Sequence, residues 1–351
     1  MPSPPDDAAG WLDTLSPWPA EFGLGRMRAL LADLGDPQLA YPAVHVVGTN
    51  GKSTATLTVE ALLRAEGLSV GATISPHIRS WSERIRVDGA EVDFDTALAG
   101  VRPAVEVRRA TQFEAVTGAA FATFAARGVD AAVVEAGLGG RLDATNVLRS
   151  RVVLLTNVSL EHTEVLGDTR EAIAAEKLAV VRDDAVAVLP DDEFSHLLPA
   201  GATHLLGGAR EAAEAFLGHP VAQTVEVRLP GRLERRGDDV WDGAHNPAGV
   251  SWLVERLPPG ERVVLASILA DKDVDAMLAT LSRAGRRFVA TRSSNPRALD
   301  AGELGRRAAA HFAEVVVEPD PHVALRRARE LGPVLATGSL YLVGDLAQAE
   351  A

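Results

Sequence analysis

Short apolar runs alternate along the chain with longer segments of helical pattern. In the N-terminal part these runs are VHVV at 44–47, VGATI at 70–74, AAVVEA at 131–136, RVVLLTN at 151–157 and AVAVL at 185–189. Short runs rich in β-branched residues are typical of strands, and their alternation with helical segments indicates parallel pairing. The pattern therefore predicts a mainly parallel sheet covered by helices.

A second series of apolar runs occupies the C-terminal part. It comprises DVWDGA from 239, RVVLASI from 262, RRFVATR from 286, EVVVEP from 314 and PVLATG from 333. Between the two series, residues 218–238 combine Pro, Gly and clustered charge, which is typical of a connection between domains. We therefore expect two α/β domains, 1–228 and 229–351, with ligands bound where loops follow the strands.

Composition narrows the classes of partner. The net charge of −13, from 35 basic and 48 acidic residues, argues against nucleic acid or an anionic membrane as a partner. The absence of cysteine from the sequence excludes disulfides and thiolate chemistry. The first ten residues, MPSPPDDAAG, do not resemble a targeting signal, and no apolar stretch has membrane-spanning length. We expect a soluble cytoplasmic protein that holds any anionic ligand locally.

Lysine is rare in this sequence. Among the 35 basic residues only Lys52, Lys177 and Lys272 are lysines, and all three lie in dense motif segments. An arginine is a permanently charged planar fork, whereas a lysine can lose its proton and act as an amine. These positions are therefore candidates for chemistry that requires an ammonium or an amine.

The strongest motif follows the first apolar run. Gly48, Thr49, Asn50, Gly51, Lys52, Ser53 and Thr54 stand between a predicted strand and the helical segment TATLTVEALLRAEG. Backbone N–H groups of such a turn can cradle phosphate, while Lys52 reaches the outer phosphates and a hydroxyl contacts Mg²⁺. The full GxxxxGK[ST] pattern is not met, because its first glycine would fall on Val46. A nucleoside triphosphate site is the favoured reading, and a structural turn without ligand is the alternative.

Polar residues also follow or end three other predicted strands. Ser75 and His77 come directly after one strand, Glu135 lies inside the apolar run AAVVEA, and His162 follows RVVLLTN. A carboxylate in an apolar strand is costly to bury unless it is paired or bound to metal. Together these groups could hold Mg²⁺ with room for water and phosphate. The alternatives are a locally paired core carboxylate and an ordinary loop histidine.

Nine motifs in order resemble the folylpolyglutamate synthase and dihydrofolate synthase family, whose members are relatives of the Mur ligases. The resemblance extends from about Phe22 to Leu346. Its motifs are GTNGKST, SPHIRSWSERIRVDG, TQFEAVTGAAF, EAGLGGRLDATNV, EHTEVLGDTREAIAAEKLAVV, PGRLE, DGAHNPAG, ADKDVDAML and ATGSLYLVGDL. The resemblance implies an α/β fold with a P-loop domain of Mur ligase central type and a smaller Rossmann-like C-terminal domain.

The resemblance also implies roles for particular residues. Lys52, Lys177 and His162 would be catalytic, and Lys177 would be carbamylated by CO₂, which only a neutral amine can attack. A surface lysine paired with Glu171 or Glu176 is the alternative for Lys177. The remaining implied sets are Gly48 to Thr54, Arg232 and Asp242 for ATP; Ser53, Ser75, Glu135 and His162 for Mg²⁺; His245 and Ser339 near glutamate; and Gly23, Leu24, Gly25, Thr111, Gln112, Phe113, Glu114, Gly140, Arg141 and Leu142 for the pterin side.

The implied reaction is the ATP- and Mg²⁺-dependent addition of L-glutamate to a folate, or to dihydropteroate, by a monomeric enzyme. ATP would convert the acceptor carboxylate into an acyl phosphate, which the amino group of glutamate attacks. The sequence leaves open whether the enzyme makes dihydrofolate, extends polyglutamate, or does both. A Mur-like ligase for another carboxylate and a non-catalytic nucleotide-binding regulator are the alternatives.

The chain departs from the family pattern in three places. The family usually has a glycine between the lysine and the hydroxyl residue of the loop, whereas Ser53 directly follows Lys52, as in Mur ligases. We therefore predict that Ser53 supplies the hydroxyl for Mg²⁺. The EKAGI of the family is replaced here by EKLAV, which begins at Glu176. The segment before the interdomain connection is shorter than in the family, and the asparagine expected to contact ATP is replaced near Glu211.

Overall fold

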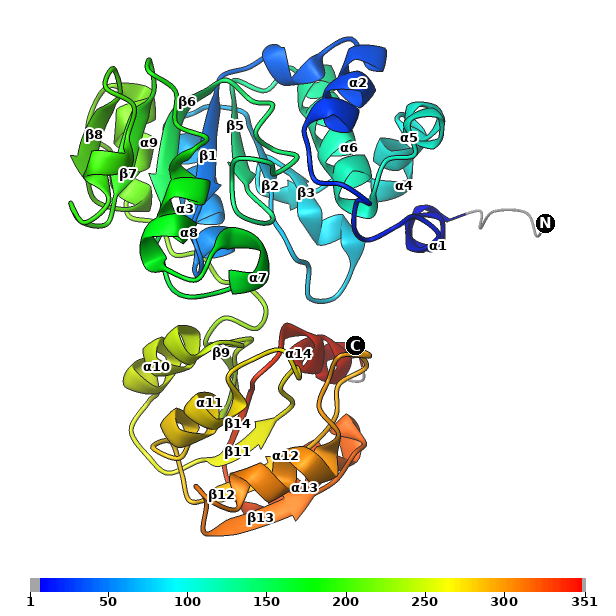
Figure 1. Ribbon diagram of the computed structural model, residues 1–351, viewed down its shortest axis with the longest axis vertical. Coiled ribbons are helices and arrows are strands. Elements are labelled where there is room, and N and C mark those ends of the chain that lie inside the picture. The colour runs from blue at the N-terminus through cyan, green and yellow to red at the C-terminus, as the bar shows by residue number, and fades with distance from the viewer. Residues whose placement is uncertain (1–6, 349–351) are drawn as a thin grey trace. The chain divides into compact units, whose positions relative to one another are not determined.

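The structure is a computed structural model that describes residues 7–348. The described residues form two compact units, one ending at Val227 and the other beginning at Arg228 (Figure 1). No helix among the described residues combines the length and apolarity needed to cross a membrane. Each unit is described below by itself.

An eight-stranded sheet forms the centre of unit 1, and its strands follow the order β4-β3-β2-β5-β1-β6-β7-β8. The strands from β2 to β8 in this order pair in parallel, while β3 pairs antiparallel with β2 and with β4. This confirms the predicted mainly parallel sheet. The strands are β1 (Ala43–Val47), β2 (Val70–Thr73), β3 (Ile85–Val87), β4 (Ala90–Glu91), β5 (Ala131–Glu135), β6 (Ser150–Leu155), β7 (Val186–Leu189) and β8 (Thr203–Leu206).

Helices cover both faces of this sheet (Figure 1). Val44 and Val46 of β1 pack with α3 and α9 on one face, whereas Ala43 and Val47 join cores on the opposite face with α6 and α8. The Val-rich runs are therefore buried on both sides, as parallel strands between helices require. The helices are α1 (Ala8–Asp13), α2 (Gly25–Asp33), α3 (Lys52–Ala65), α4 (Phe94–Ala99), α5 (Arg102–Arg108), α6 (Gln112–Arg127), α7 (Thr163–Leu166), α8 (Arg170–Leu178) and α9 (Ala209–Leu217), with short 3₁₀ turns at Pro37–Leu39, Trp81–Arg84 and Ser195–Leu197.

Unit 2 is a second, smaller α/β layer structure. Its six-stranded sheet has the order β13-β12-β11-β14-β10-β9, parallel except for the pair β9 and β10. A separate apolar core joins α10, α11 and α12 to one face of this sheet. The elements are β9 (Glu234–Arg236), β10 (Asp239–Trp241), α10 (Pro247–Arg256), β11 (Val263–Ala266), α11 (Val274–Leu281), β12 (Arg287–Ala290), α12 (Ala301–Ala308), β13 (Glu314–Val317), α13 (Pro321–Leu331), β14 (Val334–Thr337) and α14 (Leu340–Gln348).

The topology of unit 1 brings the motif loops together. Strands β2, β5, β1 and β6 are consecutive neighbours in the sheet and all run in parallel. Because parallel strands end at the same edge, the loops that follow them meet there. These loops carry the glycine-rich turn, Ser75, the segment after Glu135 and the segment that leads to His162.

Candidate active site

The glycine-rich turn makes a close approach that only glycine permits. Gly48 has a φ of +147°, and a Cβ atom there would lie 1.9 Å from Oγ1 of Thr156. Gly51, at a φ of +80°, occupies the N-cap position of α3 and faces open space. Glycine is therefore required at Gly48 by contact and at Gly51 by backbone conformation.

The segment after β6 holds this turn in place. Asn157 accepts from the backbone N–H groups of Thr49 and Asn50, each at 3.0 Å, and its Nδ2 donates to the carbonyl of Asn50 at 2.9 Å. The hydroxyl of Thr156 also donates to that carbonyl, at 2.8 Å. The backbone N–H of Ser159 donates to Oγ1 of Thr49 at 3.1 Å. Sequence reasoning treated 156–157 only as the end of a strand and missed these supporting residues.

The start of α3 is suited to bind phosphate. The first N–H groups of a helix have no carbonyl partner within the helix, so those of Lys52, Ser53 and Thr54 point out of its N-terminus. That end carries the positive end of the helix dipole. Lys52 Nζ lies 3.3 Å from the carbonyl of Thr49, which places its ammonium over the same turn. Donors, dipole and ammonium together fit an anionic phosphate chain.

Ser75 and Glu135 lie together at the ends of β2 and β5. Glu135 is only 3% exposed, and its Oε2 accepts a hydrogen bond from the Ser75 backbone N–H at 3.0 Å. Glu135 also pairs in register with Val46 of β1, one residue before the end of that strand. The carboxylate therefore lies at the sheet edge beside the glycine-rich turn.

His162 occupies the loop that follows β6. It adopts a left-handed conformation at a φ of +49° as the N-cap of α7, and its side chain is 30% exposed. Its Nε2 lies 3.6 Å from Glu161 and its Nδ1 lies 3.9 Å from Glu164. The structure thus places His162 among carboxylates, three residues after the segment that holds the glycine-rich turn.

The donor chemistry of this edge fits Mg²⁺. Carboxylate and hydroxyl oxygens come from Glu135, Ser75 and Ser53, and Ser53 is buried in the first turn of α3. Within residues 7–348, no three His, Asp or Glu side chains gather as a metal cluster. A magnesium ion usually keeps several waters and uses few protein ligands together with substrate phosphates. The residues present are consistent with that kind of site.

Lys177 is buried in the floor of the glycine-rich turn. It is 3% exposed, and its Nζ donates to the carbonyl of Gly48 at 2.9 Å. Burial, with a further contribution from the nearby Lys52 ammonium, lowers the pKa of Lys177 to about 7. The alternative of a surface lysine paired with Glu171 or Glu176 is therefore wrong.

Glycine at the next turn lets α8 approach the sheet edge. A Cβ atom on Gly140 would lie 2.7 Å from the carbonyl oxygens of both Glu176 and Lys177. Arg141 donates its backbone N–H to Glu176 at 2.9 Å and pairs through Nε with the Glu176 carboxylate at 2.8 Å. These contacts position the helix that carries Lys177.

A buried polar network supports the same turn. Asp143 accepts from the backbone N–H groups of Leu138 and Thr145 and from the Thr145 hydroxyl. His45 Nε2 lies 2.8 Å from that hydroxyl. Burial raises the pKa of Asp143 and lowers the pKa of His45 to about 3. Because the Thr145 hydroxyl donates to Asp143, it accepts from a neutral His45 protonated at Nε2.

Three segments assigned to the pterin side lie side by side. Arg26, directly after Gly23, Leu24 and Gly25, pairs with Glu114 of the first turn of α6 at 2.7 Å. Phe113 in that turn packs on Gly137, where a Cβ atom would meet its ring at 2.6 Å. Gly137 begins the turn that continues through Gly140, Arg141 and Leu142. Thr111 and Glu114 form a capping box at the start of α6. The carbonyl of Ser16, in the segment between α1 and α2, accepts a hydrogen bond from Gln112 N–H at 3.0 Å.

In unit 2, the residues assigned to ATP and glutamate gather at one edge of the sheet. Asp242, at the end of β10, accepts from the N–H groups of Leu233 and Ala244, each at 2.8 Å, and burial raises its pKa. Arg232 precedes Leu233 in the turn before β9. His245 Nδ1 lies 2.8 Å from the Gly243 carbonyl. Gly338, the residue before Ser339, donates its N–H to the Ala244 carbonyl at 3.0 Å.

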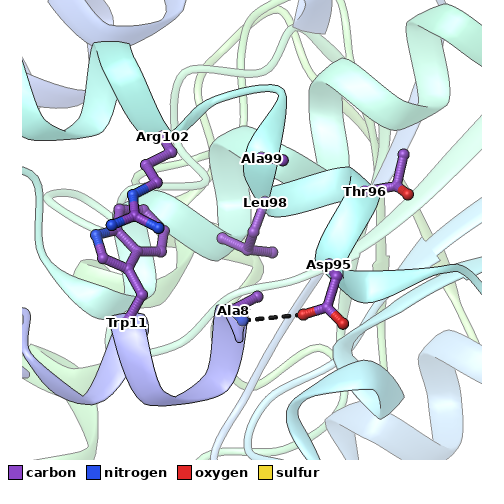
Figure 2. Close-up of a pocket in the computed structure, with 7 residues that line it drawn as sticks. All are labelled: Ala8, Trp11, Asp95, Thr96, Leu98, Ala99 and Arg102. Carbon is purple, nitrogen blue, oxygen red and sulfur yellow. Dashed lines mark hydrogen bonds between the residues drawn. The ribbon is translucent and has the colours of Figure 1, made fainter. Parts of the chain in front are cut away.

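A pocket of about 320 Å³ lies elsewhere on unit 1, among α1, α4 and α5. Figure 2 shows Arg102 stacked over the Trp11 ring and Asp95 bonded to the backbone of Ala8. None of the residues assigned to the ligands lines it. This pocket is therefore separate from the glycine-rich turn and from the candidate site at the sheet edge.

Known proteins resemble this chain in sequence and in fold. The family model of the Mur ligase middle domain matches residues 46–205. A dihydrofolate synthase/folylpolyglutamate synthase of Mycobacterium tuberculosis is 32% identical, over 84% of this chain and 80% of its own length. This chain belongs to the folylpolyglutamate synthase and dihydrofolate synthase family. That finding confirms the resemblance stated from the motifs.

Solved structures of the family share the fold of this chain. The E. coli FolC protein in complex with DHPP and ADP is 27% identical with a TM-score of 0.88, covering 97% of this chain and 96% of that one. A bifunctional family member with Mn, AMPPNP and L-glutamate bound is 28% identical with a TM-score of 0.84, covering 97% of each chain. The expected α/β fold class is therefore confirmed, while the roles of individual residues stay predictions.

Proposed function

We propose that this chain is an ATP-dependent ligase that joins L-glutamate to a folate or to dihydropteroate. The observation that carries this proposal is the position of Lys177, buried 2.9 Å from the carbonyl of Gly48 beneath the phosphate-binding turn. A buried ammonium group is costly unless it is paired or loses its proton, and the lowered pKa of Lys177 favours the neutral amine that the proposed reaction requires. Membership of a family of ligases and the conjunction of Lys177 with Glu135 and the start of α3 support the same function.

The reaction begins with an activation step because a carboxylate is a poor acyl donor. The acceptor carboxylate attacks the γ-phosphorus of ATP, forming an acyl phosphate and releasing ADP. The amino group of glutamate then attacks the acyl carbon, and inorganic phosphate leaves as the amide forms. The N-terminus of α3 and the Lys52 ammonium stabilise the charge that moves through the phosphoryl group.

Ser53, Ser75, Glu135 and His162 would hold Mg²⁺, which neutralises phosphate charge when bound. Glu135 supplies the negative charge among these ligands, and its burial makes that charge effective. His162 is the catalytic imidazole of the proposal, beside Glu161. Among these four residues, we expect Glu135 to contribute most to magnesium binding and therefore to the magnesium requirement of the activity.

Lys177 would act as a carbamate formed with CO₂. With a pKa of about 7, roughly half of the amine is neutral at pH 7, and only the neutral form attacks CO₂. The carbamate replaces a cation beside Lys52 with an oxygen anion, which would relieve the repulsion between the two ammonium groups. The carbamate oxygens would also bind a second magnesium ion or contact the phosphoryl group that is transferred.

The remaining assignments complete the proposal. Gly48 to Thr54, Arg232 and Asp242 would bind ATP, and His245 and Ser339 would lie near glutamate. Gly23 to Gly25, Thr111 to Glu114 and Gly140 to Leu142 would contact the pterin side. We expect the enzyme to act as a cytoplasmic monomer with domains 1–228 and 229–351.

A panel of acceptors tests the function. The purified protein is expected to release ADP only when a pteroate-type acceptor and glutamate are both present, with the amide product identified by mass spectrometry. Tight ATP binding without acceptor-dependent ADP release would point instead to a non-catalytic regulator. Turnover with a UDP-muramoyl acceptor would reassign the chain to a Mur-like ligase.

A further inference from the structure

The side chain of Thr49, in the glycine-rich turn, binds a neighbouring backbone segment. Thr49 is only 6% exposed. Its Oγ1 accepts a hydrogen bond from the Ser159 N–H at 3.1 Å and donates to the Ser159 carbonyl at 3.3 Å. A hydroxyl has one proton to donate. The Thr49 side chain therefore has no further proton to offer to a phosphate oxygen.

The stretch from 159 to 165 carries His162 and has little apolar support. No apolar side chain in this stretch is buried, and Leu160 is 56% exposed. Apolar packing therefore does not fix the backbone that leads to the imidazole. The two bonds from Thr49 hold that backbone at its start, three residues before His162.

The conformation of His162 makes this anchor important. The residue has a φ of +49°, in the left-handed region, and its side chain is 30% exposed. A left-handed backbone is unfavourable for a residue with a Cβ atom and persists only when its surroundings hold it. We therefore expect the imidazole to move if the segment loses its attachment at Ser159.

The glycine-rich turn is itself firmly held, so it can serve as the fixed partner. Three consecutive carbonyls of the turn each accept from a different side chain. The pairs are Gly48 with Lys177 at 2.9 Å, Thr49 with Lys52 at 3.3 Å, and Asn50 with Asn157 at 2.9 Å. The Thr49 hydroxyl thus joins a well-supported turn to a weakly supported segment.

We propose that Thr49 is a positioning residue that holds His162 in place for the metal through the backbone of Ser159. This inference rests on the proposed function, in which the turn binds phosphate and His162 binds Mg²⁺. Residues that orient a metal ligand commonly affect metal affinity as strongly as the ligand itself. Within the turn, Thr49 would act by holding the neighbouring segment and not by donating to phosphate.

Hydrogen exchange of the metal-free protein tests the anchor directly. Thr49→Val keeps the shape of the side chain but removes both bonds, whereas Thr49→Ser keeps the hydroxyl. In Thr49→Val the Ser159 amide is expected to exchange at least about tenfold faster, because it loses its acceptor. Thr49→Ser should stay near wild type. Mass spectrometry of peptides that cover 157–166 measures the exchange.

Calorimetric titration with ADP, with and without MgCl₂, tests the consequence for the metal. In Thr49→Val the gain in ADP affinity that Mg²⁺ provides should fall about tenfold. The affinity for ADP alone should stay within about threefold, since Lys52 and the N-terminus of α3 are unchanged. Thr49→Ser should recover most of the magnesium-dependent gain, which a defect in folding would not allow.

Thr58→Val is the matched control on the same helix. The Thr58 hydroxyl donates to the Thr54 carbonyl at 2.7 Å, so this variant also replaces a bonded threonine. It should leave both the exchange and the magnesium-dependent gain unchanged. Wild-type exchange at 157–166 in Thr49→Val would overturn the proposal. An equal loss of ADP affinity with and without Mg²⁺ would also overturn it, because the hydroxyl would then act on phosphate.

Kinetics of single and double variants separate this role from the proposed function. Thr49→Val should lower kcat about tenfold in wild-type protein but have no further effect on His162→Ala, because both changes act on one group. Independent losses would contradict a role through His162. Protein that ligates glutamate while Thr49→Val keeps the full magnesium-dependent gain would refute the positioning role alone. A Thr49-dependent gain without any ligation would retain that role and refute the ligase.

Discussion

At the scale of the residue, Lys177 is buried, and the proposed carbamate requires its amine. Lys177→Arg keeps the positive charge but cannot form a carbamate, so we expect ADP release to fall at least about 100-fold. Lys177→Ala should be equally inactive, with partial recovery in acetate or propionate, whose carboxylate can occupy the space of the carbamate. An acceptor-dependent ADP assay measures both variants.

The chemical rescue also serves as the control for folding. Recovery by a small acid shows that Lys177→Ala retains its structure, because the added anion can act only in an intact site. Full activity of Lys177→Arg would contradict the carbamate. It would indicate instead that a positive charge at this position is sufficient.

His45 gives a pH dependence with a definite sign. Burial, with a contribution from Arg182, lowers its pKa to about 3, whereas an unfolded histidine titrates near 6.5. Between these values the unfolded chain binds a proton that the folded chain does not, so stability is lost as pH falls below about 6.5. His45→Asn removes this titration and can still bond to Thr145.

Urea unfolding at pH 6 and pH 5 measures the effect. The free energy of unfolding of wild-type protein should fall between these values by about 1 kcal/mol more than that of His45→Asn. The neighbouring Asp143, with its raised pKa, contributes the opposite sign but is present in both proteins. Equal pH slopes in the two proteins would show that His45 remains accessible to protons.

At the scale of the element, apolar runs in the first series predicted the buried strands of unit 1 and missed its edges. Every strand expected in the first series is present, because each of them is buried between helices. The omitted strands include β8, whose residues are exposed throughout, and β4, which has only two residues. Edge strands form through pairing with a neighbour, and a local apolar pattern carries little trace of that pairing.

In the candidate site, too, some residues could be predicted from the sequence and others could not. Gly48, Lys52, Glu135 and Lys177 could be found from the sequence because their residue types are unusual in their settings. The support from Asn157 could not, since it depends on β6 lying parallel beside β1. Asparagine at the end of a strand is common, so its local sequence carries no comparable signal.

The close approach of α8 to the turn after β5 yields a prediction about Gly140. A Cβ atom there would lie 2.7 Å from two carbonyl oxygens of α8, so Gly140→Ala must displace the helix or the turn. Such overpacking typically costs about 1–3 kcal/mol. Because Lys177 lies at this contact, we expect activity to fall more than tenfold in folded protein, measured alongside the thermal midpoint.

Gly100→Ala is the matched control for this substitution. Gly100 ends α4 in a right-handed helical conformation, and a Cβ atom there would meet its nearest neighbour at an ordinary 3.6 Å. Both stability and activity should be retained. If Gly140→Ala also left stability and activity unchanged, the position of α8 would not depend on this contact.

At the scale of the whole molecule, two compact units are joined by one irregular connection. The core of unit 2 is separate from those of unit 1. The first part of the connection is held to α9, where Arg210 binds the carbonyls of Val221 and Gln223 and Glu214 binds Val221 N–H. The stretch from 224 to 229 has no helix or strand, and its residues alternate between exposed and partly buried.

This arrangement predicts where a protease cuts first. Arg228 is the only lysine or arginine between 211 and 231, and it is exposed. Trypsin needs several residues of extended, accessible backbone, which α9 and the strands do not offer but 224–229 does. Limited digestion should therefore give two persistent fragments, one ending at Arg228 and one beginning at Leu229. Arg228→Gln should abolish this cut without changing slower ones, and early cleavage within either sheet would contradict the independence of the two units.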